Sequence, residues 1–144
     1  MTIRVQRRVP APLLTVWEAW LNLSQWPSWA PGVRQVELDW TGDPLPGGTA
    51  RLRTVTGWRR YEVTALKPPD TWTWRRRLGP WTVTSHHQLQ DRGDSTTEAA
   101  ILVSFEGPAE TVVEALARLG LRPALTRRLV ALADLFREGG AGTV

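Results

Sequence analysis

The stretch TWTWRRRLGPWTVTSHHQLQDRGDSTTEAAILVSFE (residues 71–106) decides the fold, because it reads as strands joined by very short turns. Alternation of apolar and polar side chains predicts strands over Thr71–Leu78, Trp81–Gln90 and Ser95–Glu106. The links between them, GP at 79–80 and DRGD at 91–94, consist of typical turn residues. Links this short require neighbouring strands to pair antiparallel, so the stretch predicts a β-meander.

The rest of the chain adds strands and helices on both sides of this meander. The same alternation predicts earlier strands over residues 2–9, 33–40, 49–56 and 58–66. Apolar residues at three- and four-residue spacing predict a helix over 13–23, followed by a second short helix around 24–30. Similar spacing from Val112 to Phe136 predicts a long C-terminal helix, which Gly120 and Pro123 are expected to kink or break.

This order of elements predicts an α+β fold. A curved antiparallel sheet of about seven strands, with the long helix across its concave face, buries the apolar surface of both. The two short helices after the first strand would close one end of the sheet, with Trp26 and Trp29 beneath them. We expect one domain over residues 1–138 and a disordered tail over residues 139–144.

Composition narrows the functional classes. The 144 residues include no cysteine, which excludes disulfides, thiolate metal sites and a cysteine nucleophile. No apolar run approaches the ~18 residues that span a bilayer, and no signal peptide is recognisable, so we expect a cytoplasmic protein without stable membrane association. The net charge is +4, but 14 acidic residues are interspersed among the 18 basic ones, so nucleic acid is not expected as a partner.

Tryptophan is the unusual residue of this sequence. Nine tryptophans accompany one tyrosine and two phenylalanines, which is more than a compact core of this size ordinarily needs. Each indole buries on the order of 200 Å². Plain core packing explains several of these rings, and the alternative for the others is the wall of a wide, aromatic cavity.

Several segments, in this order, resemble the START-like superfamily, whose helix-grip fold is shared with pollen-allergen proteins. They are VPAPLLTVWEAWLNLSQWPSWAPGV (9–33), GGTARLRT (47–54), YEVTALKPPDTWTWR (61–75), HHQLQDRGDSTT (86–97) and FEGPAE (105–110). Within that superfamily, the sequence is most similar to the polyketide cyclase/dehydrase and lipid transport group. The resemblance implies a deep cavity between the sheet and the C-terminal helix that accepts an apolar or aromatic small molecule. It does not settle the function, because this fold hosts receptors, carriers, enzymes and chaperone activators.

The residues expected to contact such a ligand come from the sheet, from the second short helix and from the C-terminal helix. They are Trp26, Trp29, Tyr61, Trp72, Trp74, His87, Leu116 and Leu129. His86 and His87 are adjacent in a strand and therefore point to opposite faces, so they cannot jointly bind one metal ion. His87 shares a face with Val83 and Leu89. It is either a general base or ligand-binding residue, or a wall histidine with a satisfied hydrogen bond.

Charged residues in the strands also have two interpretations. Arg75 and Arg77 share a face that is typical of a solvated convex surface, whereas Arg76 lies on the opposite face, with Trp72 and Trp74. An arginine inside the cavity would select a carboxylate or enolate, and it would require an acidic partner on the protein or the ligand. Glu62 is interpreted as a surface acid or, alternatively, as a cavity acid with a raised pKa.

The motifs exclude several kinds of chemistry. No Ser-His-Asp order, nucleophile elbow, phosphate-binding loop or zinc signature occurs, so we expect neither a metal nor an obligatory cofactor. The first hypothesis is a binding module for a hydrophobic or aromatic small molecule. Such a module is expected to be a monomer or a weak homodimer. The second is a polyketide cyclase/aromatase-type enzyme, which needs at least two titratable groups in the cavity and whose catalytic residues are unknown. The third is a chaperone-cofactor or protein-interaction module, which needs a large exposed apolar patch.

Overall fold

The structure is a computed structural model that describes residues 2–142, without the side chains of residues 118 and 138–142. Its elements occur in the predicted order. They are β1 (Ile3–Val9), α1 (Leu13–Leu21), the single turn η1 (Leu23–Gln25), α2 (Trp26–Trp29), β2 (Gln35–Leu38), β3 (Thr49–Thr54), β4 (Gly57–Lys67), β5 (Thr71–Leu78), β6 (Trp81–Asp91), β7 (Thr97–Glu106) and α3 (Glu110–Gly142).

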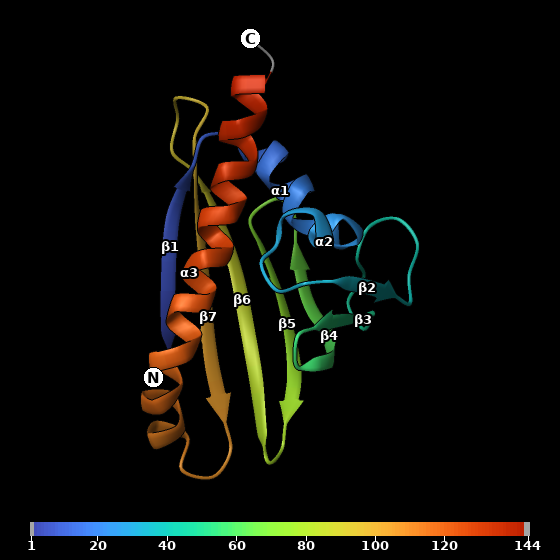
Figure 1. The fold of residues 1–144 in the computed structure, drawn as a ribbon, viewed down its shortest axis with the longest axis vertical. Coiled ribbons are helices and arrows are strands. Elements are labelled where there is room, and N and C mark those ends of the chain that lie inside the picture. The colour runs from blue at the N-terminus through green and yellow to red at the C-terminus, as the bar shows by residue number, and fades with distance from the viewer. Residues whose placement is uncertain (1, 143–144) are drawn as a thin grey trace.

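The seven strands form one antiparallel sheet in the order β1-β7-β6-β5-β4-β3-β2. From β2 to β7 each strand pairs with its neighbour in sequence, and β1 pairs with β7, so the meander and the α+β helix-grip fold are confirmed. Figure 1 shows α3 lying along the side of the sheet formed by β1 and β7, with α1 and α2 over one end. The strands β4, β3 and β2 turn away from α3 (Figure 1).

The long helix α3 is a single element, so Gly120 and Pro123, which were expected to kink or break it, do not break it. A proline inside a helix costs about 3 kcal/mol in isolation. Beyond Pro123, however, Leu125, Leu129 and Leu132 bury one face of the helix, and α3 packs against β1 and β7. Tertiary packing therefore holds the helix together where local propensity would end it.

The predicted tail overlaps the end of this helix. Because α3 runs to Gly142, residues 139–142 belong to the helix, and residues 143–144 of the predicted tail lie outside the described residues.

The turn from β7 into α3 depends on Gly107, and this leads to a prediction. Its φ angle is +147°, and an added Cβ would lie 2.7 Å from Trp81 Cδ1 and 2.8 Å from the Pro80 carbonyl oxygen. The Trp81 indole is itself fixed, because its Nε1 donates to the Pro108 carbonyl oxygen at 2.8 Å. Gly107→Ala is therefore expected to lower the free energy of unfolding by roughly 1–3 kcal/mol in chemical denaturation.

Gly93→Ala is the control for this prediction. Gly93 has a φ angle of +73°, but a Cβ added there meets no atom within 4 Å. Gly93→Ala should lower the free energy of unfolding by about 1 kcal/mol, which is the cost of placing alanine in a backbone conformation that glycine prefers. Equal losses at the two positions would contradict the steric role of Gly107.

Candidate ligand-binding cavity

The interior beneath α1 and α2 is filled by an aromatic cluster. Its members are Trp20, Trp26, Trp29, Tyr61, Trp72, Trp74 and His87. The ring of Trp72 stacks on His87 at a centroid distance of 3.7 Å, and that of Tyr61 stacks on Trp74 at 4.1 Å. The Trp26 indole donates its Nε1 hydrogen to the Trp20 carbonyl oxygen at 3.0 Å. This end of the fold is a packed core.

His87 is held inside the aromatic cluster as a neutral ring. It is fully buried, and its Nδ1 lies 3.2 Å from the Trp72 carbonyl oxygen, which makes Nδ1 the protonated nitrogen of the pair. Burial lowers the pKa of His87 well below its ordinary value, and the nearby positive charge of Arg128 lowers this pKa further. Within the described part of the chain, Nε2 of His87 is buried without a hydrogen-bond partner. His87 does not border the cavity described next.

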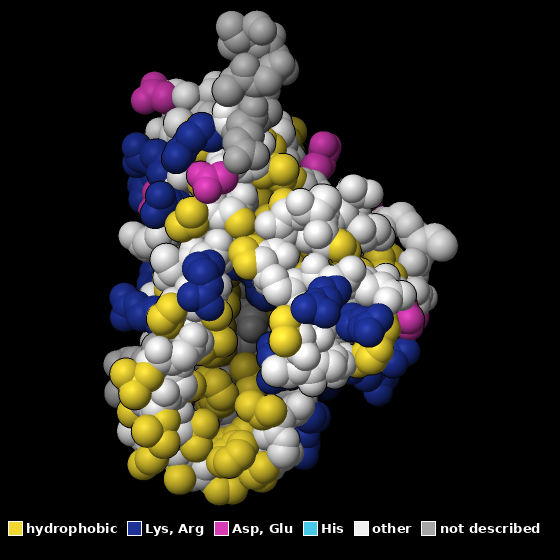
Figure 2. Space-filling model, in the orientation of Figure 1, with side chains coloured by type: hydrophobic (Ala, Val, Ile, Leu, Met, Phe, Trp, Pro, Cys, Tyr) yellow, Lys and Arg dark blue, Asp and Glu magenta, His cyan; other side chains and the backbone are white. Residues whose placement is uncertain are grey.

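Beyond the aromatic cluster, the space between the sheet and α3 is open. A cavity of about 620 Å³ is bounded by β4, β5, β6, β7 and one face of α3. Three small residues on that helix, Ala117, Gly120 and Ala124, face the cavity at three- and four-residue spacing, which leaves room beside the sheet. Figure 2 shows the hollow, with hydrophobic side chains gathered beneath it and Arg or Lys side chains at its borders.

Most of the cavity wall is apolar. Tyr61 and Trp74 form the boundary with the aromatic cluster, and Ser85 is the one uncharged polar residue besides Tyr61 among the described lining residues. The aliphatic and phenyl side chains of the wall are Leu78, Val83, Val103, Phe105, Val113, Leu116, Leu121 and Leu125. Such a wall favours hydrocarbon or aromatic ligands.

Three arginines enter this wall from different elements: Arg59 from β4, Arg76 from β5 and Arg128 from α3. All three are half-buried. The guanidinium carbon of Arg76 lies 5.9 Å from the centroid of the Tyr61 ring, and that of Arg128 lies 5.2 Å from the centroid of the Trp26 ring. Burial lowers the pKa of Arg128, the neighbouring Arg59 lowers it further, and Tyr61 opposes this shift.

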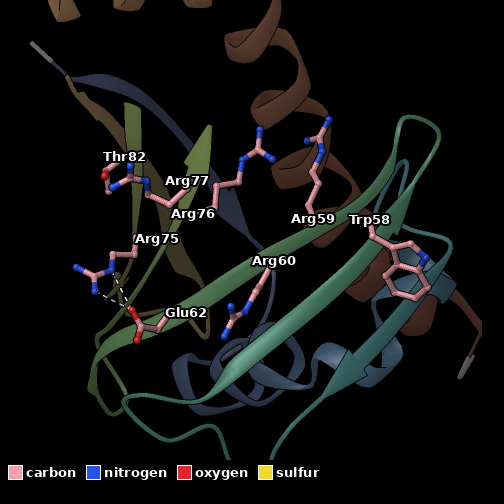
Figure 3. A pocket seen from close by; sticks show the side chains of 8 residues that line it. All are labelled: Trp58, Arg59, Arg60, Glu62, Arg75, Arg76, Arg77 and Thr82. Atoms are coloured by element: carbon pink, nitrogen blue, oxygen red, sulfur yellow. Dashed lines mark hydrogen bonds and ion pairs between the residues drawn. The ribbon is translucent and has the colours of Figure 1, made fainter. Parts of the chain in front are cut away.

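The sheet is split where two of these arginines lie. Pairing between β4 and β5 ends at Glu62 opposite Arg75; beyond this pair, β4 is bonded to β3 and β5 is bonded to β6. Arg59 and Arg76 stand on the two separated edges. Figure 3 shows both side chains directed to the side of α3, with Arg60 and the Arg75–Glu62 ion pair away from it. On the outer face, a hollow of about 550 Å³ shares Arg59 and Arg76 with the cavity.

The structure separates the eight residues predicted to contact a ligand into those that line the cavity and those that do not. Tyr61, Trp74 and Leu116 line the cavity. Four others belong to the packed interior and not to the cavity wall, namely Trp26, Trp72, His87 and Leu129, each at most 1% exposed. Trp29 is half-buried and packs its ring on Trp26 at a centroid distance of 5.6 Å.

Sequence reasoning did not single out Arg59 or Arg128, although each carried a signal. Arg59 is two residues from Tyr61 in a strand, which places both on the same face. Arg128 lies three residues after Leu125 on the apolar face of α3. Glu62, by contrast, pairs with Arg75 at 2.8 Å between exposed side chains, in agreement with its interpretation as a surface acid.

The described residues contain no group of three or more His, Asp or Glu side chains that could hold a metal ion. No helix in the described part is long and apolar enough to cross a membrane.

Comparisons with known proteins agree with this architecture. The family described as polyketide cyclase / dehydrase and lipid transport matches residues 1–137. A START superfamily protein from Mycobacterium smegmatis is 14% identical, with a TM-score of 0.72 over 94% of this chain and 98% of the other. Norcoclaurine synthase from Thalictrum flavum, a point mutant with a transition-state analogue, is 15% identical, with a TM-score of 0.73 over 97% and 96%.

A third solved structure is a di-domain aromatase/cyclase. This protein, BexL of the BE-7585A biosynthetic pathway, is 13% identical, with a TM-score of 0.74 over 93% of this chain and 45% of the other. A search of the curated proteins found no match. At these identities the structural likeness establishes the fold and not the activity. Because the family match covers nearly the whole chain and the sheet grips the long helix as in START-like proteins, the chain belongs to the polyketide cyclase/dehydrase and lipid transport family.

Proposed function

We propose that this protein binds a hydrophobic or aromatic small molecule, lipid- or polyketide-like, between β4–β7 and α3. The observation that carries this proposal is the cavity of about 620 Å³ with a mostly apolar wall. Its volume lies within the roughly 300–1,000 Å³ that is typical of ligand pockets. The family match supports the same class of ligand.

Exposed apolar side chains at the cavity give the physical reason for binding. Leu116 and Leu78 both line the cavity, and they are 65% and 42% exposed. A ligand that covers such surfaces gains about 25 cal/mol for each Å² of apolar area removed from water. Val112 and Leu119 are also exposed on α3. Exposed apolar side chains are the feature that the third hypothesis, a protein-interaction module, needs.

An enzyme of the cyclase/aromatase type is the alternative, favoured by the family to which the chain belongs. It requires at least two titratable groups that converge on the ligand. The described wall contains Tyr61 and the three arginines, but neither a carboxylate nor His87. These groups can position a ligand and stabilise negative charge, whereas proton transfer is left to Tyr61 alone. Binding is therefore the stronger proposal.

A matched pair of variants on α3 tests the binding proposal. Ala117 is half-buried against the cavity and Ala115 is on the exposed face. Ala117→Phe is expected to weaken binding of the fluorescent probe N-phenylnaphthylamine about tenfold or more, because the phenyl ring occupies the ligand's space. Ala115→Phe should bind like the unaltered protein. Equal affinities in the two variants, both folded by circular dichroism, would contradict the proposal, as would purified protein that binds no hydrophobic probe.

A further inference from the structure

The arginines of the cavity differ from several arginines of the outer surface in their partners. Outside, Arg51 pairs with Glu37 at 2.9 Å and Arg75 pairs with Glu62 at 2.8 Å. Among the described residues, no carboxylate forms an ion pair with Arg59, Arg76 or Arg128, and the described cavity lining contains neither Asp nor Glu. Some exposed arginines therefore have an acidic partner on the protein, whereas the three half-buried arginines of the cavity have none among the described residues.

This arrangement is unfavourable without a counter-charge. A half-buried guanidinium has lost part of its hydration, and like charges close to one another repel. Arg59 also donates to the Thr56 hydroxyl at 3.2 Å, a neutral group that does not offset its charge. Groups held in this way are typical of sites where an outside molecule brings the missing charge.

We propose that Arg59, Arg76 and Arg128 bind the anionic group of an amphipathic ligand, a carboxylate or another oxyanion, whose apolar body occupies the cavity. This inference rests on the proposed function and defines the class of ligand more narrowly. The guanidinium groups supply planar forks of N–H donors that match the oxygens of such an anion. The phenyl and aliphatic wall around Phe105 and Leu116 takes the apolar body.

The position of Arg59 places the anionic group at the opening. Arg59 borders the cavity, the outer hollow of about 550 Å³, and a third hollow of about 300 Å³ between β3, β4 and α3. Arg76 borders the cavity and the outer hollow. Arg128 borders the cavity and the third hollow. An anion at this junction keeps part of its hydration while the apolar body covers the apolar wall of the cavity, which lowers the cost of binding a charge.

Two probes with the same aromatic body test the proposal. Anilinonaphthalene sulfonate carries an anionic oxygen group, and N-phenylnaphthylamine lacks it. The protein is expected to bind the sulfonate about tenfold more tightly than the neutral probe, because hydrogen bonds to charged groups are among the stronger ones. The preference should shrink as potassium chloride is raised, since salt screens the partly exposed charges.

An exposed arginine outside the cavity and the two hollows is the matched control. Arg59→Gln and Arg76→Gln are each expected to reduce sulfonate affinity about tenfold while leaving the affinity for the neutral probe unchanged. Arg53→Gln, on the exposed face of β3, should change neither affinity, because Arg53 lines neither the cavity nor either hollow. Arg128→Gln is a third test, accompanied by a thermal unfolding measurement because its guanidinium also packs on Trp26.

The outcomes separate this inference from the proposed function. If both probes bind equally and the inner and outer arginine variants behave alike, the anion site is wrong while the binding module stands. If neither probe binds, the proposed binding function is wrong, and the anion site is wrong with it. Displacement of the sulfonate by dodecanoate or dodecyl phosphate, but not by dodecanol, supports the anion site and identifies which oxyanion it prefers. Displacement by all three equally would overturn it.

Discussion

Trp72→Ala is expected to lower the free energy of unfolding by about 3–5 kcal/mol, the range for removing a buried aromatic ring. Trp72 is 1% exposed and lies at the centre of the aromatic cluster. Its ring stacks on His87 at 3.7 Å and meets Trp74 edge-on at 5.0 Å and Trp20 at 6.1 Å, all between ring centroids. Alanine leaves a cavity that these large, rigid rings cannot fill. Urea denaturation followed by circular dichroism measures the loss.

Two further variants keep this prediction testable. Trp72→Phe retains part of the ring and should remain folded with a smaller loss, in case the alanine variant does not fold. Trp58→Ala is the surface control: Trp58 is 41% exposed and carries Arg51 above its ring at 4.9 Å. An exposed cation–π contact contributes about 0.5–1 kcal/mol. If Trp58→Ala costs as much as Trp72→Ala, the central role of Trp72 in the core is disproved.

Acidification is expected to destabilise the protein through His87. Its pKa in the folded state is lowered, mainly by burial, whereas the unfolded chain has the ordinary value of about 6.5. Between these two values the unfolded chain binds a proton that the folded protein does not bind. Stability is therefore fully present above the unfolded pKa and is lost as the pH falls below it. The loss approaches ~1.4 kcal/mol for each pH unit, or about 1 kcal/mol between pH 7 and 5.5.

Variants of the two adjacent histidines isolate this effect. His87→Phe fills the same place against Trp72 and should remove the pH dependence in this window. His86→Gln should keep it, because His86 is exposed and its Nδ1 contacts the Thr73 hydroxyl at 3.0 Å. The measurement is the free energy of unfolding by urea at several pH values. A slope in His87→Phe as steep as in the unaltered protein would assign the pH dependence to other groups.

The structure also changes what His87 is expected to do for ligands. Val83, His87 and Leu89 are all buried, as the alternation along their strand predicts. Alternation along a strand predicts which residues point inward, but it does not predict whether the inside at that position is filled or open. Trp20, Trp72 and Trp74 fill the space around His87, so the ring contributes to the core and not to the described cavity wall.

The sequence by itself determined the fold, because the periods of strands and helices and the shortness of the turns are local properties. Residues 71–106 alone specify three adjacent antiparallel strands, and the pattern from Val112 to Phe136 specifies the helix that covers them. Only the tertiary structure decided where the interior is hollow. The cavity arises where β4 and β5 separate beyond the pair Glu62–Arg75 and where small residues of α3 face the gap. These are non-local events, and they alone bring Arg59, Arg76 and Arg128 together from three elements.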